Sequence, residues 1–325
     1  MSSEIEARKM MAAQIHSYGE SSELKYEEIV RPVAMGKQLL IRVYSAGVNP
    51  VDDKIRQGAF GAGAKLASPL VLGYDVAGVV EEVGDQVTRF EEGDEVFAYL
   101  SLQRGGGYAE YAIVLEAEAA LKPELLSFDE AASVPLAALT AWQALVNQGD
   151  LSDGQSVLIH GGSGGVGSFA IQIAKARGAK VYATASARNQ EFMKQLGADV
   201  VIDYKSQRFE EIAKDIDVVL DPIGGETQLR SFDVLKKDGI LISIVQSPDP
   251  KLAAERGVRA VQMLVKPNGD ELSELAELID LEAIRCNVTE VLPLKDAAKA
   301  HDLIHTGHTR GKIVLHVCDE GDVRK

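Results

Sequence analysis

The stretch HGGSGGVG, from His160 to Gly167, decides the fold because of the segments on either side of it. Before it, Ser156–Ile159 is a short apolar run typical of a buried parallel strand. After it, SFAIQIAKARGA (168–179) has the apolar spacing of a helix that ends at Gly178, and Lys180–Ala185 indicates a second strand. Strand, glycine turn, helix and strand in this order predict a dinucleotide-binding unit.

The glycines of the turn fit the G-x-G-x-x-G spacing at Gly162, Gly164 and Gly167. In this pattern the first glycine allows a tight turn, the second lets the backbone approach a pyrophosphate, and the third lets the helix pack closely on the strand. The helix N-terminus adds free N–H groups and the positive end of the helix dipole. A glycine-rich turn without a ligand is the alternative.

The end of the second strand indicates which dinucleotide is bound. A site for NAD usually has an Asp or Glu about 20 residues beyond the glycines, whereas TASARN (184–189) contains no carboxylate. Ser186 and Arg188 are therefore predicted to select NADP, because a guanidinium group binds phosphate in a planar fork. A solvated Arg at the start of a helix is the alternative.

Length and charge limit the other possibilities. The 325 residues are enough for two domains, and a net charge of −15 disfavours nucleic acid and anionic membrane surfaces as partners. We find no signal-peptide pattern and no apolar run long enough to span a bilayer. Cys286 and Cys318 are expected to be free thiols, so a cytoplasmic location is expected.

The pattern along the chain changes near Ser127, from short strands and turns to alternating strands and helices. FDEAASVPLAALTAWQALV (128–146) is predicted as one helical stretch that contains Pro135. The final strand, Lys312–Val317, is expected to return to the first domain. Six parallel strands are predicted in a doubly wound sheet, formed by the two strands around the glycine turn and by VVIDY (200–204), DVVLD (217–221), GILISIV (239–245) and AVQMLV (260–265).

With these segments placed, the chain resembles the medium-chain dehydrogenase/reductase superfamily, and within it the zinc-independent quinone oxidoreductase (zeta-crystallin-like) branch. The resemblance implies an α/β fold with a discontinuous, β-rich GroES-like catalytic domain (1–128 and 268–325) and a Rossmann NADP-binding domain (129–267), with the active site in the cleft between them. It rests on AGVNPVDDKIRQG (46–58), LGYDVAGVVEEVG (72–84), GGYAEY (106–111), LTAWQAL (139–145), the HGGSGGVG stretch, LGADVVIDY (196–204) and HTRGKIVLHV (308–317).

The same resemblance argues against a metal. Alcohol dehydrogenases of this superfamily have a catalytic Cys where Asn49 stands and Gly-His-Glu where this chain has GYD (73–75), and their four-Cys zinc lobe is missing here. A catalytic zinc needs three protein ligands and an open position. His301, His305 and His308 form another metal-like pattern, and we expect them to be solvated histidines on a terminal helix. No metal is expected.

For the activity, the resemblance implies hydride transfer from NADPH to a quinone or to the β-carbon of an α,β-unsaturated carbonyl, followed by protonation. Such an acceptor is polarised by its own carbonyl, whereas an unactivated alcohol is hard to oxidise without a Lewis acid. The expected partner is a small hydrophobic carbonyl or quinone. The alternatives are a catalytically idle NADPH-binding protein and a zinc-dependent alcohol dehydrogenase, the latter disfavoured by Asn49 and Tyr74.

Candidate donors of hydrogen bonds to the developing enolate oxygen are Asn49 and Lys54. Many quinone oxidoreductases have Tyr at the position of Lys54, which leaves the identity of the proton donor open. The alternative for Lys54 is a surface lysine or one that contacts the cofactor ribose. Asn49 is better suited to position the substrate or the nicotinamide ribose. Tyr74 and Tyr108 are candidates for the pocket wall or for the core, and Asp52 is expected to cap or pair within the domain.

On the cofactor side, the resemblance places Thr140 and the backbone of Ser163–Val166 at the pyrophosphate, and Tyr204 with Ser186 and Arg188 at the 2′-phosphate. Ile244 is expected along the nicotinamide. Lys312 is expected near the cofactor, with a salt bridge as the alternative, and the segment 260–265 is expected to extend the sheet in a homodimer. The full set of predicted contacts is Thr140, Gly162, Ser163, Gly164, Gly165, Val166, Gly167, Ser186, Arg188, Tyr204, Ile244 and Lys312.

Overall fold

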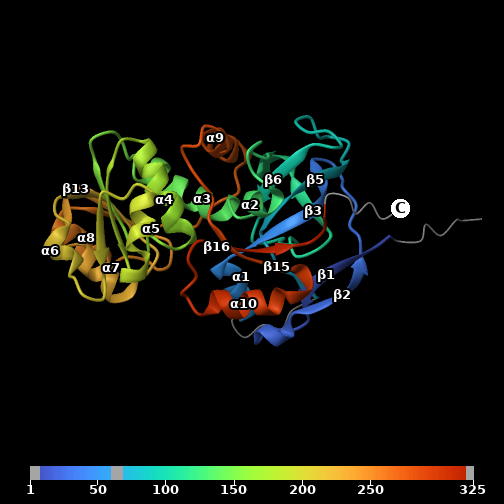
Figure 1. The fold of residues 1–325 in the computed structure, drawn as a ribbon, viewed down its shortest axis with the longest axis horizontal. Helices are drawn as coiled ribbons and strands as arrows, with labels where there is room; N and C mark the ends of the chain where they lie inside the picture. The colour runs from blue at the N-terminus through green and yellow to red at the C-terminus, as the bar shows by residue number, and fades with distance from the viewer. Residues whose placement is uncertain (1–7, 60–68, 320–325) are drawn as a thin grey trace, which may run out of the picture. The chain divides into compact units, whose positions relative to one another are not determined.

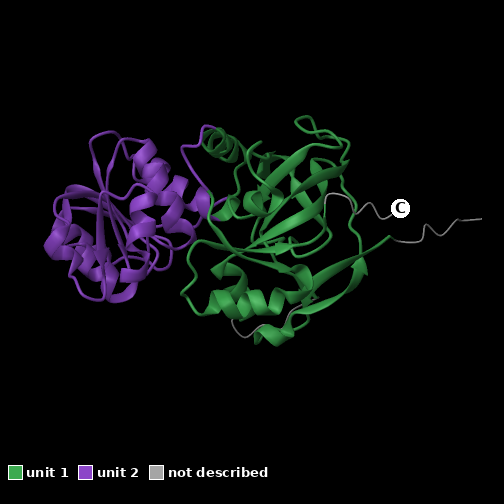
Figure 2. Cartoon of the chain, in the orientation of Figure 1, with its two compact units in different colours: residues 1–136, 267–280, 286–325 green, residues 137–266, 281–285 purple. Residues whose placement is uncertain are grey.

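The computed structural model describes residues 8–59 and 69–319, and its chain forms two compact units (Figure 2). Unit 1 comprises Met1–Leu136, Pro267–Asp280 and Cys286–Lys325. Unit 2 comprises Ala137–Lys266 and Leu281–Arg285. Within the described residues, unit 1 contains a seven-stranded and a three-stranded sheet, and unit 2 contains a six-stranded sheet. Among the described residues, the helices are too short or too polar to cross a membrane.

Unit 1 is rich in antiparallel strands (Figure 1). Its larger sheet has the order β15-β16-β3-β5-β6-β8, with β7 also paired to β3, and its smaller sheet has the order β2-β1-β4. As expected, the C-terminal strand returns here, because β16 pairs antiparallel with β3. The strands are β1 Lys9–Ile15, β2 Lys25–Val30, β3 Gln38–Val48, β4 Leu70–Val71, β5 Asp75–Val83, β6 Glu95–Tyr99, β7 Tyr111–Leu115, β8 Ala119–Leu121, β15 Val288–Pro293 and β16 Lys312–His316.

Four helices of unit 1 are α1 Pro50–Arg56, α2 Phe128–Ala132, α9 Gly269–Asp280 and α10 Ala297–His305. The start of α1 is well specified by sequence, because Asn49 is extended and Pro50 takes the first helical position, where its missing N–H is not needed. The carboxylate of Asp52 accepts the backbone N–H of Asn49 and so completes the cap. This cap holds Asn49 at the junction of β3 and α1.

Unit 2 contains the predicted six-stranded parallel sheet, in the order β11-β10-β9-β12-β13-β14. Its central strands are the most buried, since every residue of β12 and three of the four residues of β9 are buried, as is typical of parallel sheets covered by helices on both faces. Strand β9 has β10 on one side and β12 on the other, so the carboxyl end of β9 is the switch point of the sheet. The strands are β9 Ser156–Ile159, β10 Lys180–Ala185, β11 Val200–Asp203, β12 Ile216–Asp221, β13 Leu235–Ser243 and β14 Arg259–Gln262.

The helices that follow these strands are α4 Gly165–Ala176, α5 Gln190–Gln195, α6 Phe209–Ile212, α7 Gly225–Ser231 and α8 Pro250–Arg256, and α3 Pro135–Trp142 precedes the sheet. One core cluster of unit 2 packs Phe209 and Phe232 against sheet residues Leu158, Val219 and Leu241. These residues are at most 4% exposed, so this region is well suited to hold the strand ends in a fixed geometry.

Two predictions about element bounds were wrong. The stretch 128–146 is not one helix, since α2 ends at Ala132 and α3 begins anew at Pro135, followed by a π-helical turn at Gln143–Gln148. Proline lacks the N–H that would continue a helix and disfavours helical geometry in the residue before it, so it starts the second helix instead. The run 260–265 is not a strand over its whole length, since β14 spans Arg259–Gln262 and ends three residues earlier than predicted.

Candidate functional site

The glycine turn lies between β9 and α4, but its tight bend is not at the predicted glycine. The residue with a left-handed backbone is Gly161, with φ of 59°, rather than Gly162. Gly162 is tightly packed instead, because a Cβ there would lie 2.8 Å from Met193 Sδ and 3.0 Å from Ala183 Cβ. The turn is therefore held against both β10 and α5.

The third glycine of the pattern has the role that the spacing predicts. A Cβ on Gly167 would overlap the carbonyl oxygen of Gly161 and would lie 2.7 Å from the Cα of Gly162. Both are backbone atoms, which cannot move aside as a flexible side chain can. At Gly164, by contrast, the nearest contact of an added Cβ is the Gly161 oxygen at 3.4 Å. The side of Gly164 is thus open for a ligand to approach.

The first turn of α4 carries unpaired donors. Within the described part of the chain, no acceptor binds the backbone N–H groups of Gly165, Val166 and Gly167. Such orphan N–H groups lie at the positive end of the helix dipole and favour an anion. The hydroxyl of Ser163 accepts a hydrogen bond from Asn189 Nδ2 at 2.9 Å, which ties the turn to the segment after β10. This geometry can hold a pyrophosphate.

The residues predicted at the 2′-phosphate lie at one edge of the sheet. Strands β10 and β11 are parallel, with Ala185 opposite Asp203, so Ser186 and Tyr204 follow neighbouring strand ends. Ser186 is half-buried, and Arg188 and Tyr204 are exposed. Asp203 is the carboxylate at this edge, and hydrogen bonds from Ser206 and from the Lys205 N–H lower its pKa and keep it in its own turn. Sequence reasoning missed Lys205, a cation immediately after Tyr204.

The other predicted contacts in unit 2 lie at different places. Thr140 is 3% exposed on α3, and Ile244 follows β13 with its N–H donated to the Asp221 carbonyl at 3.1 Å. The carboxylate of Asp221, fully buried at the end of β12, fixes the turn that follows this strand. Its four donors are the N–H groups of Ile223 and Gly224 and the side chains of Gln228 and Ser243, all at 2.8–3.0 Å.

In unit 1, Asn49 belongs to a buried polar triad. Its Nδ2 donates to Asp75 Oδ2 at 2.8 Å, and its Oδ1 accepts from Lys312 Nζ. Lys312 Nζ also lies 3.4 Å from Asp75 Oδ2, and the three side chains come from residues at most 4% exposed. Burial raises the pKa of Asp75 even though the Lys312 charge lowers it. The salt bridge considered for Lys312 is therefore present, and its cofactor contact stays a prediction.

A second buried contact joins Asp52 to Tyr108. Asp52 Oδ2 accepts the Asn49 N–H at 2.6 Å and the Tyr108 hydroxyl at 2.9 Å, which confirms the expected capping role of Asp52. Asp52 Oδ1 is buried, and no residue in the described part of the chain gives it a hydrogen bond. Burial raises the pKa of Asp52 to about 7, although the hydrogen bonds from Asn49 and Tyr108 lower it. Tyr74 and Tyr108 are at most 1% exposed, so both have the burial of core residues.

This raised pKa gives a prediction about stability. Between about pH 4 and pH 7 the folded state keeps a proton on Asp52 that the unfolded chain has released, so the Asp52 contribution to stability falls as pH rises. Asp52→Asn removes this dependence. The stability of Asp52→Asn relative to the wild type should therefore rise from pH 5 to pH 8, with a slope of at most about 1.4 kcal/mol per pH unit. Urea unfolding at both pH values measures it, and a constant or falling difference would contradict the raised pKa.

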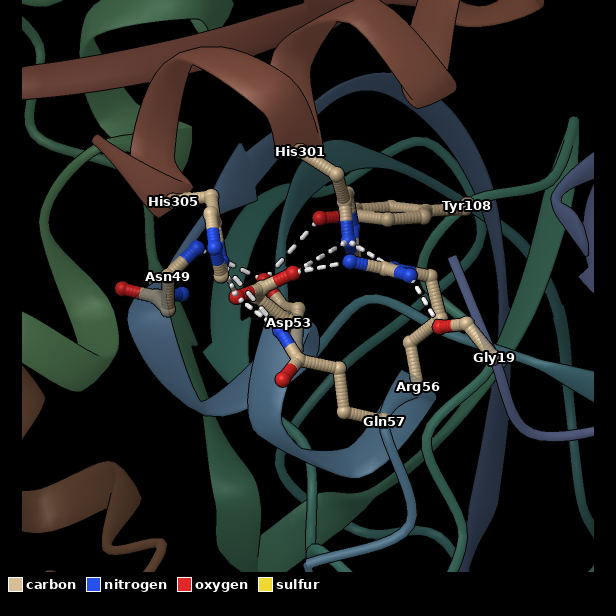
Figure 3. Close-up of polar contacts among 9 residues, drawn as sticks. Gly19, Asn49, Asp53, Arg56, Gln57, Tyr108, His301 and His305 are labelled. Atoms are coloured by element: carbon tan, nitrogen blue, oxygen red, sulfur yellow. Dashed lines mark hydrogen bonds and ion pairs between the residues drawn. The ribbon is translucent and has the colours of Figure 1, made fainter. Parts of the chain in front are cut away.

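Lys54 lies on α1 and is exposed. On the same helix, Asp53 and Arg56 are buried and face α10 (Figure 3). Arg56 Nε donates to His301 Nδ1 at 3.2 Å, and His305 Nδ1 lies 2.9 Å from Asp53 Oδ2. These contacts fasten α10 to α1.

The prediction that the terminal histidines are solvated was wrong for His301, which is 0% exposed. Its partner Arg56 is far away in sequence, so no local pattern indicates its burial. Burial lowers the pKa of His301 to about 4, so the ring is neutral near pH 7. Among residues 8–59 and 69–319, no three His, Cys, Asp or Glu side chains are grouped to hold a metal ion.

Comparisons with known proteins agree with this architecture. Residues 36–124 match the alcohol dehydrogenase GroES-like domain, and residues 196–315 match the domain family described as zinc-binding dehydrogenase. The chain is 40% identical over 320 residues to an NADPH-dependent alkenal/one oxidoreductase, chloroplastic, of Arabidopsis thaliana, with 95% of this chain and 80% of that protein covered.

Two solved structures extend the likeness to the whole chain. The quinone oxidoreductase from Coxiella burnetii has a TM-score of 0.88 and 36% identity, covering 96% of this chain and 100% of that one. A mycobacterial protein in complex with NADPH has a TM-score of 0.85 and 30% identity, covering 94% of this chain and 99% of that one. The chain therefore belongs to the medium-chain dehydrogenase/reductase superfamily, in the branch of the quinone oxidoreductases.

Proposed function

We propose that this protein is an NADPH-dependent reductase of quinones or of the C=C bond of α,β-unsaturated carbonyls. The observation that carries the proposal is the first turn of α4, where three N–H groups have no acceptor among the described residues and lie beside the open side of Gly164. The relatives support the chemistry, since their names include an NADPH-dependent alkenal/one oxidoreductase and a quinone oxidoreductase. Bound NADPH would supply a hydride to the β-carbon, and the electron pair of the C=C bond would move to the carbonyl oxygen.

In this proposal unit 2 binds the cofactor. The N–H groups of Gly165, Val166 and Gly167 hold the pyrophosphate, and Arg188 with Ser186 holds the 2′-phosphate. The segment TASARN (184–189) at the end of β10 contains no carboxylate that would repel that phosphate. The Asp203 carboxylate at the end of β11 accepts hydrogen bonds within its own turn. The remaining proposed contacts are Thr140, Gly162, Ser163, Gly164, Tyr204, Ile244 and Lys312.

Unit 1 supplies the proposed groups for the substrate and the proton. The amide of Asn49 is held in one orientation by Lys312 and Asp75. Asn49 is the proposed contact to the substrate or to the nicotinamide ribose. Lys54 is exposed on the same helix and is the proposed proton source for the enolate. Tyr74 and Tyr108 are proposed to give the pocket its shape from within the core.

We further propose that the reaction needs no metal. Asn49 and Tyr74 offer neither thiolate nor imidazole, and Asp75 is already paired with Lys312. The proposed homodimer would form along β14, which ends the sheet order and is followed by the exposed Leu264. The proposed location is cytoplasmic, on the basis of the free thiols of Cys286 and Cys318.

The test is oxidation of NADPH, compared with NADH, by a panel of 2-alkenals, enones and quinones after treatment with a chelator. Turnover that survives the chelator and prefers NADPH supports the proposal, and the ranking of acceptors identifies the substrate class. Lys54→Met should lower kcat about 10- to 100-fold if Lys54 donates the proton, with the exposed Lys251→Met as control. NADPH binding without turnover would favour an idle binding protein.

The choice of cofactor gives a separate prediction. Arg188→Ala should weaken NADPH binding about 10- to 100-fold, the equivalent of one charge-assisted hydrogen bond, and should change NADH binding little. Only NADPH presents a 2′-phosphate to the guanidinium group. Calorimetric titration with both cofactors measures the two affinities, and equal losses would remove Arg188 from the recognition of the phosphate.

A further inference from the structure

A buried histidine stands immediately before the glycine turn and contacts two hydroxyl groups. His160 is 1% exposed at the end of β9. Its Nδ1 lies 3.1 Å from Thr184 Oγ1 on β10, and its Nε2 lies 2.9 Å from Ser231 Oγ, the last residue of α7. The ring of Phe209 packs edge-on against the imidazole at 4.7 Å between centroids. The proposed cofactor contacts do not include His160, Thr184 or Ser231.

The donor and the acceptor of each hydrogen bond between these side chains can be assigned by starting from Ser231. Ser231 Oγ donates to the Thr227 carbonyl at 2.7 Å, so it must accept from His160 Nε2–H. With its proton on Nε2, the neutral ring can only accept at Nδ1, and it therefore takes the Thr184 hydroxyl proton. Burial lowers the pKa of His160 to about 4, which keeps the ring neutral near pH 7.

The orientation of the Thr184 hydroxyl matters because Thr184 holds the glycine turn. Its Oγ1 accepts the Gly161 N–H at 3.3 Å, and its carbonyl accepts the Gly162 N–H at 2.9 Å. Gly161 in turn accepts the Gly164 N–H at 3.0 Å and is the backbone on which Gly167 packs. The position of the unpaired donors at the start of α4 thus depends on Thr184, and through it on His160.

We propose that His160, Thr184 and Ser231 form a one-directional hydrogen-bond chain that positions the glycine turn for the pyrophosphate. The inference rests on the proposed function, because it assumes that this turn binds NADPH. The chain joins the end of β9 to β10 through Thr184 and to the last residue of α7 through Ser231. His160 and Thr184 are positioning residues, which act through the turn and need no contact with the cofactor.

The test compares two ligands on the full-length protein. NADPH contains the pyrophosphate, whereas adenosine 2′-phosphate contains only the part that Ser186 and Arg188 are proposed to hold. Thr184→Val keeps the shape of the side chain and removes the hydroxyl that contacts the buried His160 Nδ1 and the partly buried Gly161 N–H. It should weaken NADPH at least about 10-fold and adenosine 2′-phosphate less than about 2-fold. Thr184→Ser keeps the hydroxyl and should restore NADPH affinity.

Two variants of His160 test the direction of the chain. His160→Asn places an amide oxygen near the position of Nδ1 and can accept from Thr184, whereas His160→Gln places its amide near Ser231. The His160→Asn variant should therefore retain more of the NADPH affinity than the His160→Gln variant. Ser156→Ala, at the opposite end of β9, is the matched control and should lower the Tm without changing NADPH affinity.

Three results would overturn the inference. The first is NADPH binding by Thr184→Val that equals the wild type, and the second is an equal loss of both ligands, which would indicate general damage to the sheet. The third is retention by His160→Gln but not by His160→Asn. A wild type that fails to bind NADPH at all would overturn the proposed function itself, and the inference with it.

Discussion

Gly167→Ala is expected to weaken NADPH binding by about one to two orders of magnitude and to lower the free energy of unfolding by about 1–3 kcal/mol. The added methyl group would overlap the Gly161 carbonyl oxygen and would lie 2.7 Å from Gly162 Cα. Because both neighbours are backbone atoms, either α4 or the turn must move. That movement displaces the N–H groups of Gly165 and Val166 from the position in which they face the pyrophosphate.

Gly164→Ala is the matched control, since it makes the same chemical change three residues earlier. Its Cβ would meet only the Gly161 oxygen, at the ordinary contact distance of 3.4 Å. Folding stability should stay near that of the wild type, whereas NADPH affinity should fall, because the methyl group occupies the side from which the pyrophosphate approaches. Thermal unfolding and calorimetric titration of both variants separate the two effects. NADPH binding by Gly167→Ala at the wild-type level would contradict this account of the turn.

The parallel sheet was predictable because its signals are local. Strands buried on both faces are continuous apolar runs, and β11 and β12 stand out from the polar helices around them. The glycine spacing located the turn, yet it could not tell which glycine adopts the left-handed backbone. Three glycines among 161–164 are available for that role, and the structure gives it to Gly161.

The candidate site was less predictable where it depends on contacts distant in sequence. Asn49 and Lys312 are 263 positions apart, and Arg56 and His301 are 245 apart. A sequence can nominate Asn49 and Lys312 separately from their motifs, but the triad with Asp75 exists only once β16 pairs with β3. The sequence alone indicates no role for His160, because its partners lie on β10 and α7.

Lys312→Met is expected to lower the free energy of unfolding by about 3–5 kcal/mol near pH 8, the usual loss when one partner of a buried ion pair is removed. Asp75 is 0% exposed and, among the described residues, would keep the Asn49 amide and the Leu136 N–H as its donors. The loss should become smaller near pH 5. Burial raises the pKa of Asp75, and loss of the Lys312 charge raises it further. The folded state then holds a proton that the unfolded state releases, so stability falls as pH rises.

Two controls separate the ion pair from other roles of Lys312. The first control, Lys312→Arg, keeps the positive charge beside Asp75. The second, the double variant Asp75→Asn/Lys312→Met, removes both charges and should recover most of the stability lost near pH 8. Urea unfolding at both pH values measures these differences, with NADPH titration in parallel. Removal of a structural ion pair would leave the Asp75 carboxylate without a counter-charge in the core, and this costs stability. If Lys312→Met kept wild-type stability but lost NADPH affinity, the lysine would therefore be buried here for the cofactor contact and not for the ion pair.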